Sequence, residues 1–152
     1  MLTMVDTVAT VRVNGMVVLE AKNSFRDYRV PLGDVAKTGE NEISVTFHSP
    51  IKAAQAAQDA HPFFLPWQTE NAPIPNGNLL RKVQCDFGWD WNIALAPFGI
   101  YGDLRIEAAK APRIDSVKVT QDHSDGVTLT VMAEVSNHLG QVDVSLGGQT
   151  CS

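Results

Sequence analysis

The sequence predicts an all-β fold, and three observations support this prediction. Apolar and polar residues alternate along several short segments, as they do in strands with one buried face. The Asn14-Gly15 pair, two residues that tolerate the positive φ angles of a type I′ turn, joins the first two of these segments. Only residues 51–60 have the composition of a helix, because they are rich in alanine and contain no glycine or proline.

Four strands are predicted before that helix. Val5 to Val13 alternates, and Met16 to Ala21 returns after the turn as its antiparallel partner. Phe25 to Val30 is a third strand candidate, with Phe25, Asp27 and Arg29 on one side and Arg26, Tyr28 and Val30 on the other. Ile43 to His48 is the fourth, and we expect it to end at Ser49-Pro50 because proline cannot continue a strand.

Two loops and two further strands follow the helix. Residues 61–78 contain four prolines with Phe63, Phe64 and Trp67, which predicts an ordered but irregular loop. Such a loop serves either function or tight packing, and both readings stay open here. Leu79 to Phe87 and Gly99 to Ala108 are predicted strands, with a second loop over residues 89–97 between them.

The remaining residues predict a second, incomplete domain. Residues 109–113 are the best linker candidate, so the domains are expected at 1–108 and 114–152. Three short strands are predicted after the linker, at Ile114 to Gln121, Val127 to Ser136 and Gln141 to Leu146. Three strands cannot close a sandwich, so this unit is expected to be marginally stable by itself.

Charge and composition exclude several function classes. The 152 residues carry a formal net charge of −5, and their arginines are scattered singly, so neither a nucleic-acid surface nor an anionic-membrane surface is expected. No apolar stretch approaches the roughly 20 residues of a membrane helix. The first residues run directly into a strand without a signal-peptide layout, which favours a cytoplasmic location but leaves the compartment unassigned if the chain begins inside a domain.

Metal, cofactor and disulfide chemistry are not expected either. The four histidines form no pair at the spacing of metal ligands, and there is no Cys-x-x-Cys. Glycine-rich phosphate loops and the Gly-x-Ser-x-Gly motif are also missing, so no cofactor is predicted. Cys85 and Cys151 lie in different predicted domains, which makes a disulfide between them improbable.

The segment Phe87-Gly88-Trp89-Asp90-Trp91 is the candidate site, because two of the three tryptophans flank one carboxylate. Indole faces pack on the C–H faces of a pyranose, and a carboxylate accepts hydrogen bonds from its hydroxyls. Tryptophans beside glycine and aspartate also occur in cores and turns. From these five residues alone, a sugar platform and a structural turn both remain possible.

The longer run over residues 81–108, RKVQCDFGWDWNIALAPFGIYGDLRIEA, resembles the signature of β-mannosidases of glycoside hydrolase family 2. These enzymes have an Arg-Lys-x-Gln segment, then Phe-x-Trp-Asp-Trp, then Gly-Ile-Trp. Val13-Asn14-Gly15 and Gly39-Glu40-Asn41 are also similar to that family. Much of this pattern is shared with β-galactosidases and β-glucuronidases, whereas the Trp-Asp-Trp cluster is particular to the mannosidases.

The resemblance implies a galactose-binding-like jelly-roll β-sandwich that lacks its first strands, followed by the start of an immunoglobulin-like sandwich. In the family a (β/α)8 barrel comes next and holds the two catalytic glutamates of a retaining glycosidase. We therefore expect a chain cut at both ends, with no catalytic residue of its own and no activity by itself. Asn41-Glu42 is similar to the Asn-Glu of the barrel, but it precedes a strand of the first domain and is not expected to be catalytic.

The same resemblance assigns roles within the aromatic motif. Trp89 and Asp90 match residues that reach into the barrel's active site, where the aspartate accepts hydrogen bonds from the terminal mannose. Trp91 is expected to pack beneath the loop and support it. Two positions depart from the family pattern: Asn92-Ile93 stands where Gly-Pro is usual, and Tyr101 replaces a tryptophan.

Three hypotheses follow for function. The first is the non-catalytic part of a β-mannosidase, or of another family 2 glycosidase, whose partners are a β-mannoside or manno-oligosaccharide and the absent barrel. The second is a stand-alone carbohydrate-binding β-sandwich module. The third is a β-sandwich interaction domain with its aromatic residues at an interface.

Overall fold

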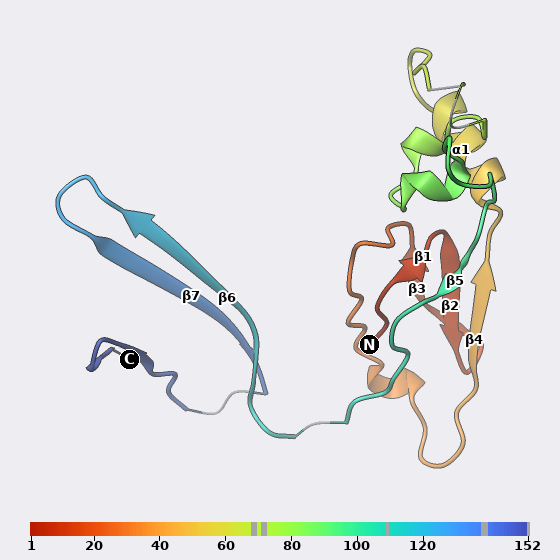
Figure 1. Cartoon of the computed structure of the whole chain (residues 1–152). Coiled ribbons are helices and arrows are strands. Elements are labelled where there is room, and N and C mark those ends of the chain that lie inside the picture. The colour runs from red at the N-terminus through yellow and green to blue at the C-terminus, as the bar shows by residue number, and fades with distance from the viewer. Residues whose placement is uncertain (68–69, 71–72, 109, 138–139, 152) are drawn as a thin grey trace. The chain divides into compact units, whose positions relative to one another are not determined.

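The computed structural model describes residues 1–152 except 68–69, 71–72, 109, 138–139 and 152 (Figure 1). The chain forms two compact units, Met1–Ile106 and Glu107–Ser152, and each is described by itself. Ala109 of the expected linker and part of the expected loop at 61–78 lie outside the described residues, as do residues 138–139 between the last two predicted strands. The assignment of these units to a sugar-binding domain and an immunoglobulin-like domain stays a prediction.

A three-stranded antiparallel sheet organises the first unit. Its strands are β2 (Ala9–Val13), β3 (Met16–Ala21) and β4 (Ile43–Phe47), in the order β3-β2-β4. Asn14 and Gly15 join β2 to β3 with φ angles of 51° and 82°, which confirms the predicted turn. These two residues therefore set the pairing next to the turn, Val13 with Met16, and the register shifts further along, between Arg12 and Val11.

A second, two-stranded pairing completes the core of this unit. β1 (Val5–Asp6) pairs antiparallel with β5 (Gly99–Ile100), although they lie far apart in the sequence. The buried core cluster comprises Leu2, Val5, Ala9, Val11 and Ala21, with Phe47 and Ile100 packed against it. Its members come from both pairings, so the apolar faces of β1–β5 and of the larger sheet share one core.

Four strand predictions need correction in the first unit, and three of them concern residues 5–13, 25–30 and 99–108. The predicted strand 5–13 is interrupted at Thr7–Val8, which separates β1 from β2. Phe25 to Val30 is not a strand: Tyr28 forms a single bridge to Leu2, and Phe25 is 63% exposed. That segment contains three charged residues, so it has no apolar face to bury. Strand 99–108 shortens to β5 and one bridge at Leu104.

Leu79 to Phe87 was also predicted to be a strand, and this prediction is wrong. The structure has two 3₁₀ helices there, η2 (Gly77–Leu79) and η3 (Gln84–Phe87). The Gln84 side-chain amide donates to the carbonyls of Leu80 (3.0 Å) and Lys82 (3.3 Å). A side chain that binds nearby carbonyls competes with a strand ladder for the same acceptors. The chain therefore turns locally where its apolar pattern favours extension.

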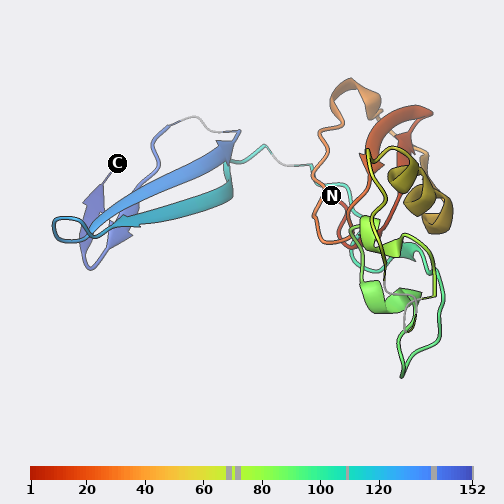
Figure 2. The same cartoon turned by 90° about the horizontal axis from the view of Figure 1, so that it is seen from above.

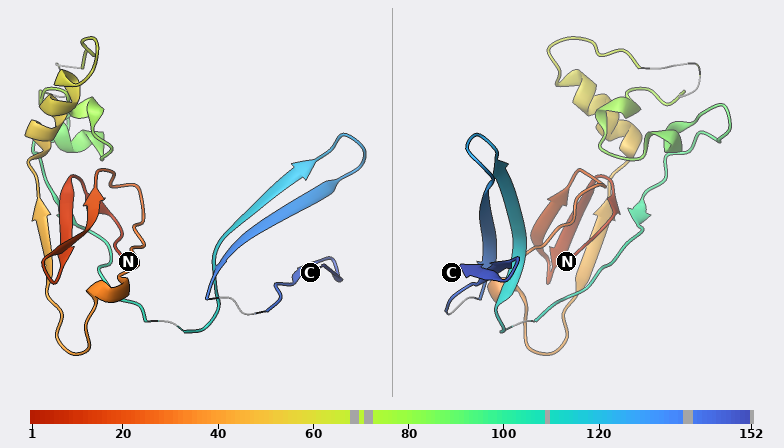
Figure 3. Two further views of the ribbon diagram at one scale, coloured as in Figure 1. Left: turned by 180° about the vertical axis from the view of Figure 1, so that it is seen from behind. Right: turned by 60° about the vertical axis from the view of Figure 1, so that its left-hand side comes forward.

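The predicted helix is confirmed as α1 (Pro50–Asp59). It begins one residue earlier than expected, because proline is well tolerated at the first helical position. The Ser49 hydroxyl caps it by accepting from the Lys52 backbone N–H at 3.3 Å. Ala54 of α1 packs with Leu80 and Phe87 in a second buried cluster. This cluster joins α1 to the 3₁₀ helices at one end of the three-stranded sheet (Figures 1 and 3).

The second unit contains two antiparallel pairs (Figure 2). β6 (Arg113–Asp122) pairs with β7 (Thr128–Ser136), close to the predicted bounds. β8 (Val144–Leu146) pairs with β9 (Gln149–Cys151), which was not predicted. The Gly147-Gly148 turn between them has φ angles of 57° and 82°, so it was a hairpin signal that the sequence reading missed.

No helix among the residues that the structure describes has the length and apolarity that crossing a membrane requires.

A buried lysine, Lys82, connects β1 to η3 and to the loop that precedes β5. The Lys82 side chain is 0% exposed, and its ammonium lies 2.9 Å from a carboxylate oxygen of Asp6 and 3.1 Å from one of Asp86. It also donates to the Pro97 carbonyl at 2.9 Å and lies 5.1 Å from the centroid of the Phe87 ring. Burial removes the ammonium from water, so these contacts must replace its hydration.

We expect Lys82→Met to lower the free energy of unfolding by about 3–5 kcal/mol, because methionine fills similar space but leaves the buried Asp6 carboxylate without a cation. Urea unfolding followed by tryptophan fluorescence measures this loss. Lys52→Met, on the exposed side of α1, is the control and should change stability by less than about 0.5 kcal/mol. Equal losses in the two variants would contradict the anchoring role of Lys82.

Candidate functional site

The Trp-Asp-Trp motif forms a tight turn that projects after η3. The backbone N–H of Trp89 donates to the Asn92 carbonyl at 3.4 Å, and that of Asn92 donates to the Trp89 carbonyl at 3.3 Å. Asp90 and Trp91 therefore occupy the tip. The Asn92 side chain donates to the Cys85 carbonyl at 2.9 Å, which ties the turn to η3. Asn92, a departure from the family pattern, thus has a defined structural role.

Gly88 makes the entry to this turn possible. Its φ of 107° and ψ of 158° lie in a region that essentially only glycine occupies. Any side chain there would strain the backbone between the buried Phe87 and the exposed Trp89. The motif Phe-Gly-Trp-Asp-Trp therefore needs a glycine at position 88, where the chain changes direction.

The three predicted site residues lie on the surface. Trp89 is 40% exposed and Trp91 is 75% exposed, with ring centroids 5.3 Å apart and planes inclined by 50°. The expectation that Trp91 packs beneath the loop is wrong, because the turn places it at the tip. Asp90 is exposed and has no hydrogen bond or ion pair with another residue in the described part of the chain. Its carboxylate is free to accept hydrogen bonds from a ligand.

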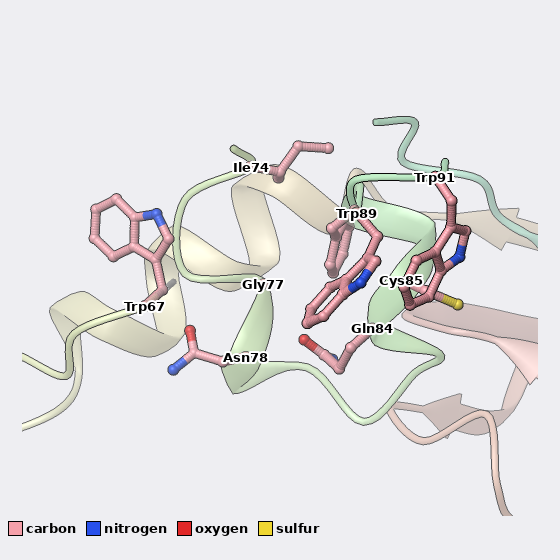
Figure 4. A pocket seen from close by; sticks show the side chains of 9 residues that line it. Trp67, Ile74, Gly77, Asn78, Gln84, Cys85, Trp89 and Trp91 are labelled. Atoms are coloured by element: carbon pink, nitrogen blue, oxygen red, sulfur yellow. The ribbon is translucent and has the colours of Figure 1, made fainter. Parts of the chain in front are cut away.

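A cavity of about 340 Å³ lies beside the turn (Figure 4). Its lining is mostly apolar and aromatic, and the residues that line it are Trp67, Ile74, Gly77, Asn78, Gln84, Cys85, Phe87, Trp89 and Trp91. Cys85 is a free, exposed thiol. This size and lining are typical of a small-molecule site. The cavity therefore brings the aromatic motif together with the loop that precedes it.

The sequence reading had not assigned Trp67, Asn78 or Gln84 to the site. The aromatic character of residues 61–78 was the available signal, but it fitted packing equally well. Gly77 explains why the two loops meet: a Cβ at this position would lie 2.4 Å from the Phe87 ring. Only a glycine lets η2 approach η3 so closely. Asp90 does not line the cavity.

The turn and the cavity present groups that can contact a ligand. Among the described residues, no group of three or more His, Cys, Asp or Glu side chains could hold a metal ion. The turn and the cavity instead offer indole faces, side-chain amides and one unpaired carboxylate. These groups suit a ligand that has both apolar faces and hydroxyl groups.

Residues 1–102 match the family described as "Glycosyl hydrolase 2 galactose-binding domain-like". The chain belongs to this family. Among its relatives, a β-mannosidase of Bos taurus is 36% identical over 110 residues, covering 68% of this chain and 12% of that protein. β-Mannosidase B of Emericella nidulans is 32% identical over 137 residues, covering 86% of this chain and 16% of that protein.

A solved structure is similar as well. The crystal structure of a β-D-mannosidase from Dictyoglomus thermophilum superposes with a TM-score of 0.71 and 26% identity. The match covers 88% of this chain and 16% of that enzyme, so the chain spans less than a fifth of the length of the relatives it matches. These similarities confirm the predicted resemblance to family 2 β-mannosidases and the all-β galactose-binding-like sandwich.

We expect Gly88→Ala to destabilise this glycosyl hydrolase 2 domain by about 1–3 kcal/mol, because alanine cannot adopt the Gly88 backbone angles without strain. Urea unfolding measures the loss, and quenching of tryptophan fluorescence by iodide reports on the turn. The matched control is Gly99→Ala in β5, where a Cβ meets no atom within 4 Å and φ is not positive. Similar behaviour of the two variants would contradict the conformational requirement at Gly88.

Proposed function

We propose that the chain is the substrate-recognition part of a β-mannosidase, and that it contributes Trp89 and Asp90 to an active site completed by a (β/α)8 barrel. The observation that carries this proposal is the unpaired, exposed Asp90 carboxylate held between two tryptophans at the tip of a turn. Membership of the glycosyl hydrolase 2 family and similarity to several β-mannosidases support the substrate class.

Asp90 would recognise the sugar by hydrogen bonding. An ionised carboxylate has two acceptor oxygens, and adjacent hydroxyls of a terminal mannose can donate to both. Each such hydrogen bond contributes about 1.5–3 kcal/mol once water is excluded. Trp89 would present its indole beside the carboxylate and pack on a C–H face of the same ring. Exclusion of water depends on the barrel closing over the turn.

Catalysis itself is assigned to the barrel. Retaining glycosidases use one carboxyl group as acid/base and a second as nucleophile, held about 5–5.5 Å apart on a rigid scaffold. Glu42 precedes β4, and its backbone N–H donates to the Asn14 side chain at 3.1 Å, so it belongs to the turn around Asn14. The role proposed for this chain is therefore to select and orient the terminal mannose.

A stand-alone carbohydrate-binding module is the second candidate. The observation that favours it is the cavity, whose lining residues all belong to the unit Met1–Ile106. A module binds its glycan unaided, whereas an active-site wall needs the barrel to complete the mannose site. Affinity for mannose separates these two functions.

We expect the 152-residue chain to hydrolyse no aryl β-mannoside and to show no saturable micromolar binding of mannose. The reason is that this chain contributes only Trp89 and Asp90 to the proposed mannose site, and the barrel supplies the rest. Release of nitrophenol and isothermal titration calorimetry are the measurements. Measurable turnover would overturn the proposal that catalysis belongs to the barrel. Micromolar mannose binding would favour the stand-alone module.

In the longer enzyme obtained by following the coding frame, we expect Asp90→Asn to lower kcat/KM for an aryl β-mannoside about tenfold to hundredfold, because the amide loses the charge and one acceptor. The proposal requires a barrel with two strand-end glutamates in that frame. Asp34→Asn, at an exposed position of η1 (Gly33–Val35), is the control and should leave kcat/KM unchanged. An unchanged kcat/KM in Asp90→Asn would remove Asp90 from substrate recognition.

A further inference from the structure

We propose that the cavity beside the turn binds a second sugar unit, the one linked to the terminal mannose that Asp90 recognises. This inference rests on the proposed function for the role of Asp90, but the cavity belongs wholly to this chain. Its evidence comes from the orientation of two side-chain amides, from its aromatic walls and from its position next to Asp90.

The side-chain amides of Gln84 and Asn78 line the cavity, and each has its nitrogen, not its oxygen, against a backbone carbonyl. A backbone carbonyl can only accept, so the amide group that faces one must be the nitrogen. The Gln84 nitrogen donates to the Leu80 and Lys82 carbonyls, and the Asn78 nitrogen donates to the Pro66 carbonyl at 3.3 Å. Neither amide oxygen accepts a hydrogen bond from another described residue. Both are therefore available as acceptors.

Acceptors of this kind select for hydroxyl groups. The Gln84 oxygen points toward the space between Asn78 and Trp89 in Figure 4. Both N–H groups of Gln84 are already bound, so Gln84 cannot reorient to donate without losing these bonds, and a ligand must supply the hydrogen to its oxygen. Asn78 has an accepting oxygen and one further N–H, so it can pair with a hydroxyl that both donates and accepts, as the hydroxyls of a sugar do.

The remaining walls suit the apolar faces of a sugar ring. Trp89 and Trp91 incline toward each other at 50°, and Trp67 and Phe87 also line the cavity. A volume of about 340 Å³ is at the lower end of the range for ligand sites. Aromatic walls with a few oriented polar groups are a usual arrangement for a small ligand. The combination fits one pyranose better than an extended apolar chain.

The position of the cavity identifies which sugar it binds. Trp89 lines the cavity and Asp90, the next residue, does not. Asp90 lies between Trp89 and Trp91, which both line the cavity, and consecutive Cα atoms are only about 3.8 Å apart, so a ligand at Asp90 lies close to the cavity wall. Two adjacent units of one β-linked glycan satisfy both positions. The Arg-Lys-x-Gln segment then has two functions, since Lys82 anchors the loop and Gln84 contacts the second sugar.

Cys85 provides a reporter, because its exposed thiol lies in the cavity lining. In a Cys151→Ser background, the rate of alkylation by iodoacetamide is measured with and without a β-1,4-linked mannose disaccharide. We expect the disaccharide to bind with a dissociation constant of about 1–10 mM. Alkylation should then slow about tenfold at about ten times the dissociation constant. Sorbitol, which has hydroxyls but no ring faces, should not slow it.

Paired variants locate the binding. Trp91→Ala removes an exposed wall of the cavity and should abolish protection by the disaccharide. Phe25→Ala removes an aromatic side chain of similar exposure that does not line the cavity, and protection should persist. The ratio of rates with and without disaccharide is compared within each variant, so a change in the intrinsic reactivity of Cys85 cancels.

Two results would overturn the inference. The first is no protection by the disaccharide at about 100 mM, ten times the weakest expected dissociation constant. If an apolar dye such as anilinonaphthalene sulfonate protects Cys85 in that case, the cavity takes an apolar ligand in place of a sugar. The second is protection that survives Trp91→Ala, which would place the binding elsewhere.

These results are independent of the test of the proposed function. If the disaccharide fails to protect Cys85 but Asp90→Asn weakens the longer enzyme, the recognition role stands and the cavity is not a sugar site. If the coding frame contains no barrel but protection is observed, the cavity binds sugar in a stand-alone module.

Discussion

The buried ammonium of Lys82 is the interaction on which the arrangement of the first unit depends. It joins Asp86 of η3 and the Pro97 carbonyl, which lie in the loops around it, to Asp6 of β1, which lies 76 residues earlier in the sequence. An unpaired charge in a core is strongly unfavourable, so these segments must meet for Lys82 to be buried at all. The loop that carries the aromatic motif is thereby held against the end of the β1–β5 pairing, and this anchoring determines where the candidate site can form.

From that anchor, the chain reaches the surface in a few residues. Phe87 is buried, Gly88 reverses the direction with backbone angles that other residues avoid, and Trp89 emerges. The Asn92 side chain then holds the turn to η3. A turn fixed at its base can present a carboxylate and two indoles without burying them. Such preorganisation favours ligand binding because little conformational freedom remains to be lost.

Local signals predicted the elements that depend on local chemistry. The Asn14-Gly15 turn, β4 and α1 were all predicted, because turn residues, alternation and alanine content act within a few positions. The strand predicted over Leu79 to Phe87 failed because Gln84 binds the carbonyls of its own segment, which an apolar pattern does not reveal. Trp91 was expected to be packed, but whether an indole at a turn is buried depends on which segments lie nearby.

The all-β class, the hairpin, the helix and the family resemblance carried by Trp89, Asp90 and the residues around them could all be predicted from the amino-acid sequence. It also contained Trp67, Asn78 and Gln84, but not the fact that they share one cavity. That fact depends on folding, because the cavity exists where Gly77 lets η2 approach Phe87 and where Lys82 holds the next loop in place. Contacts between distant segments arise from packing and charge burial, and these have no signature in the spacing of residues along the chain.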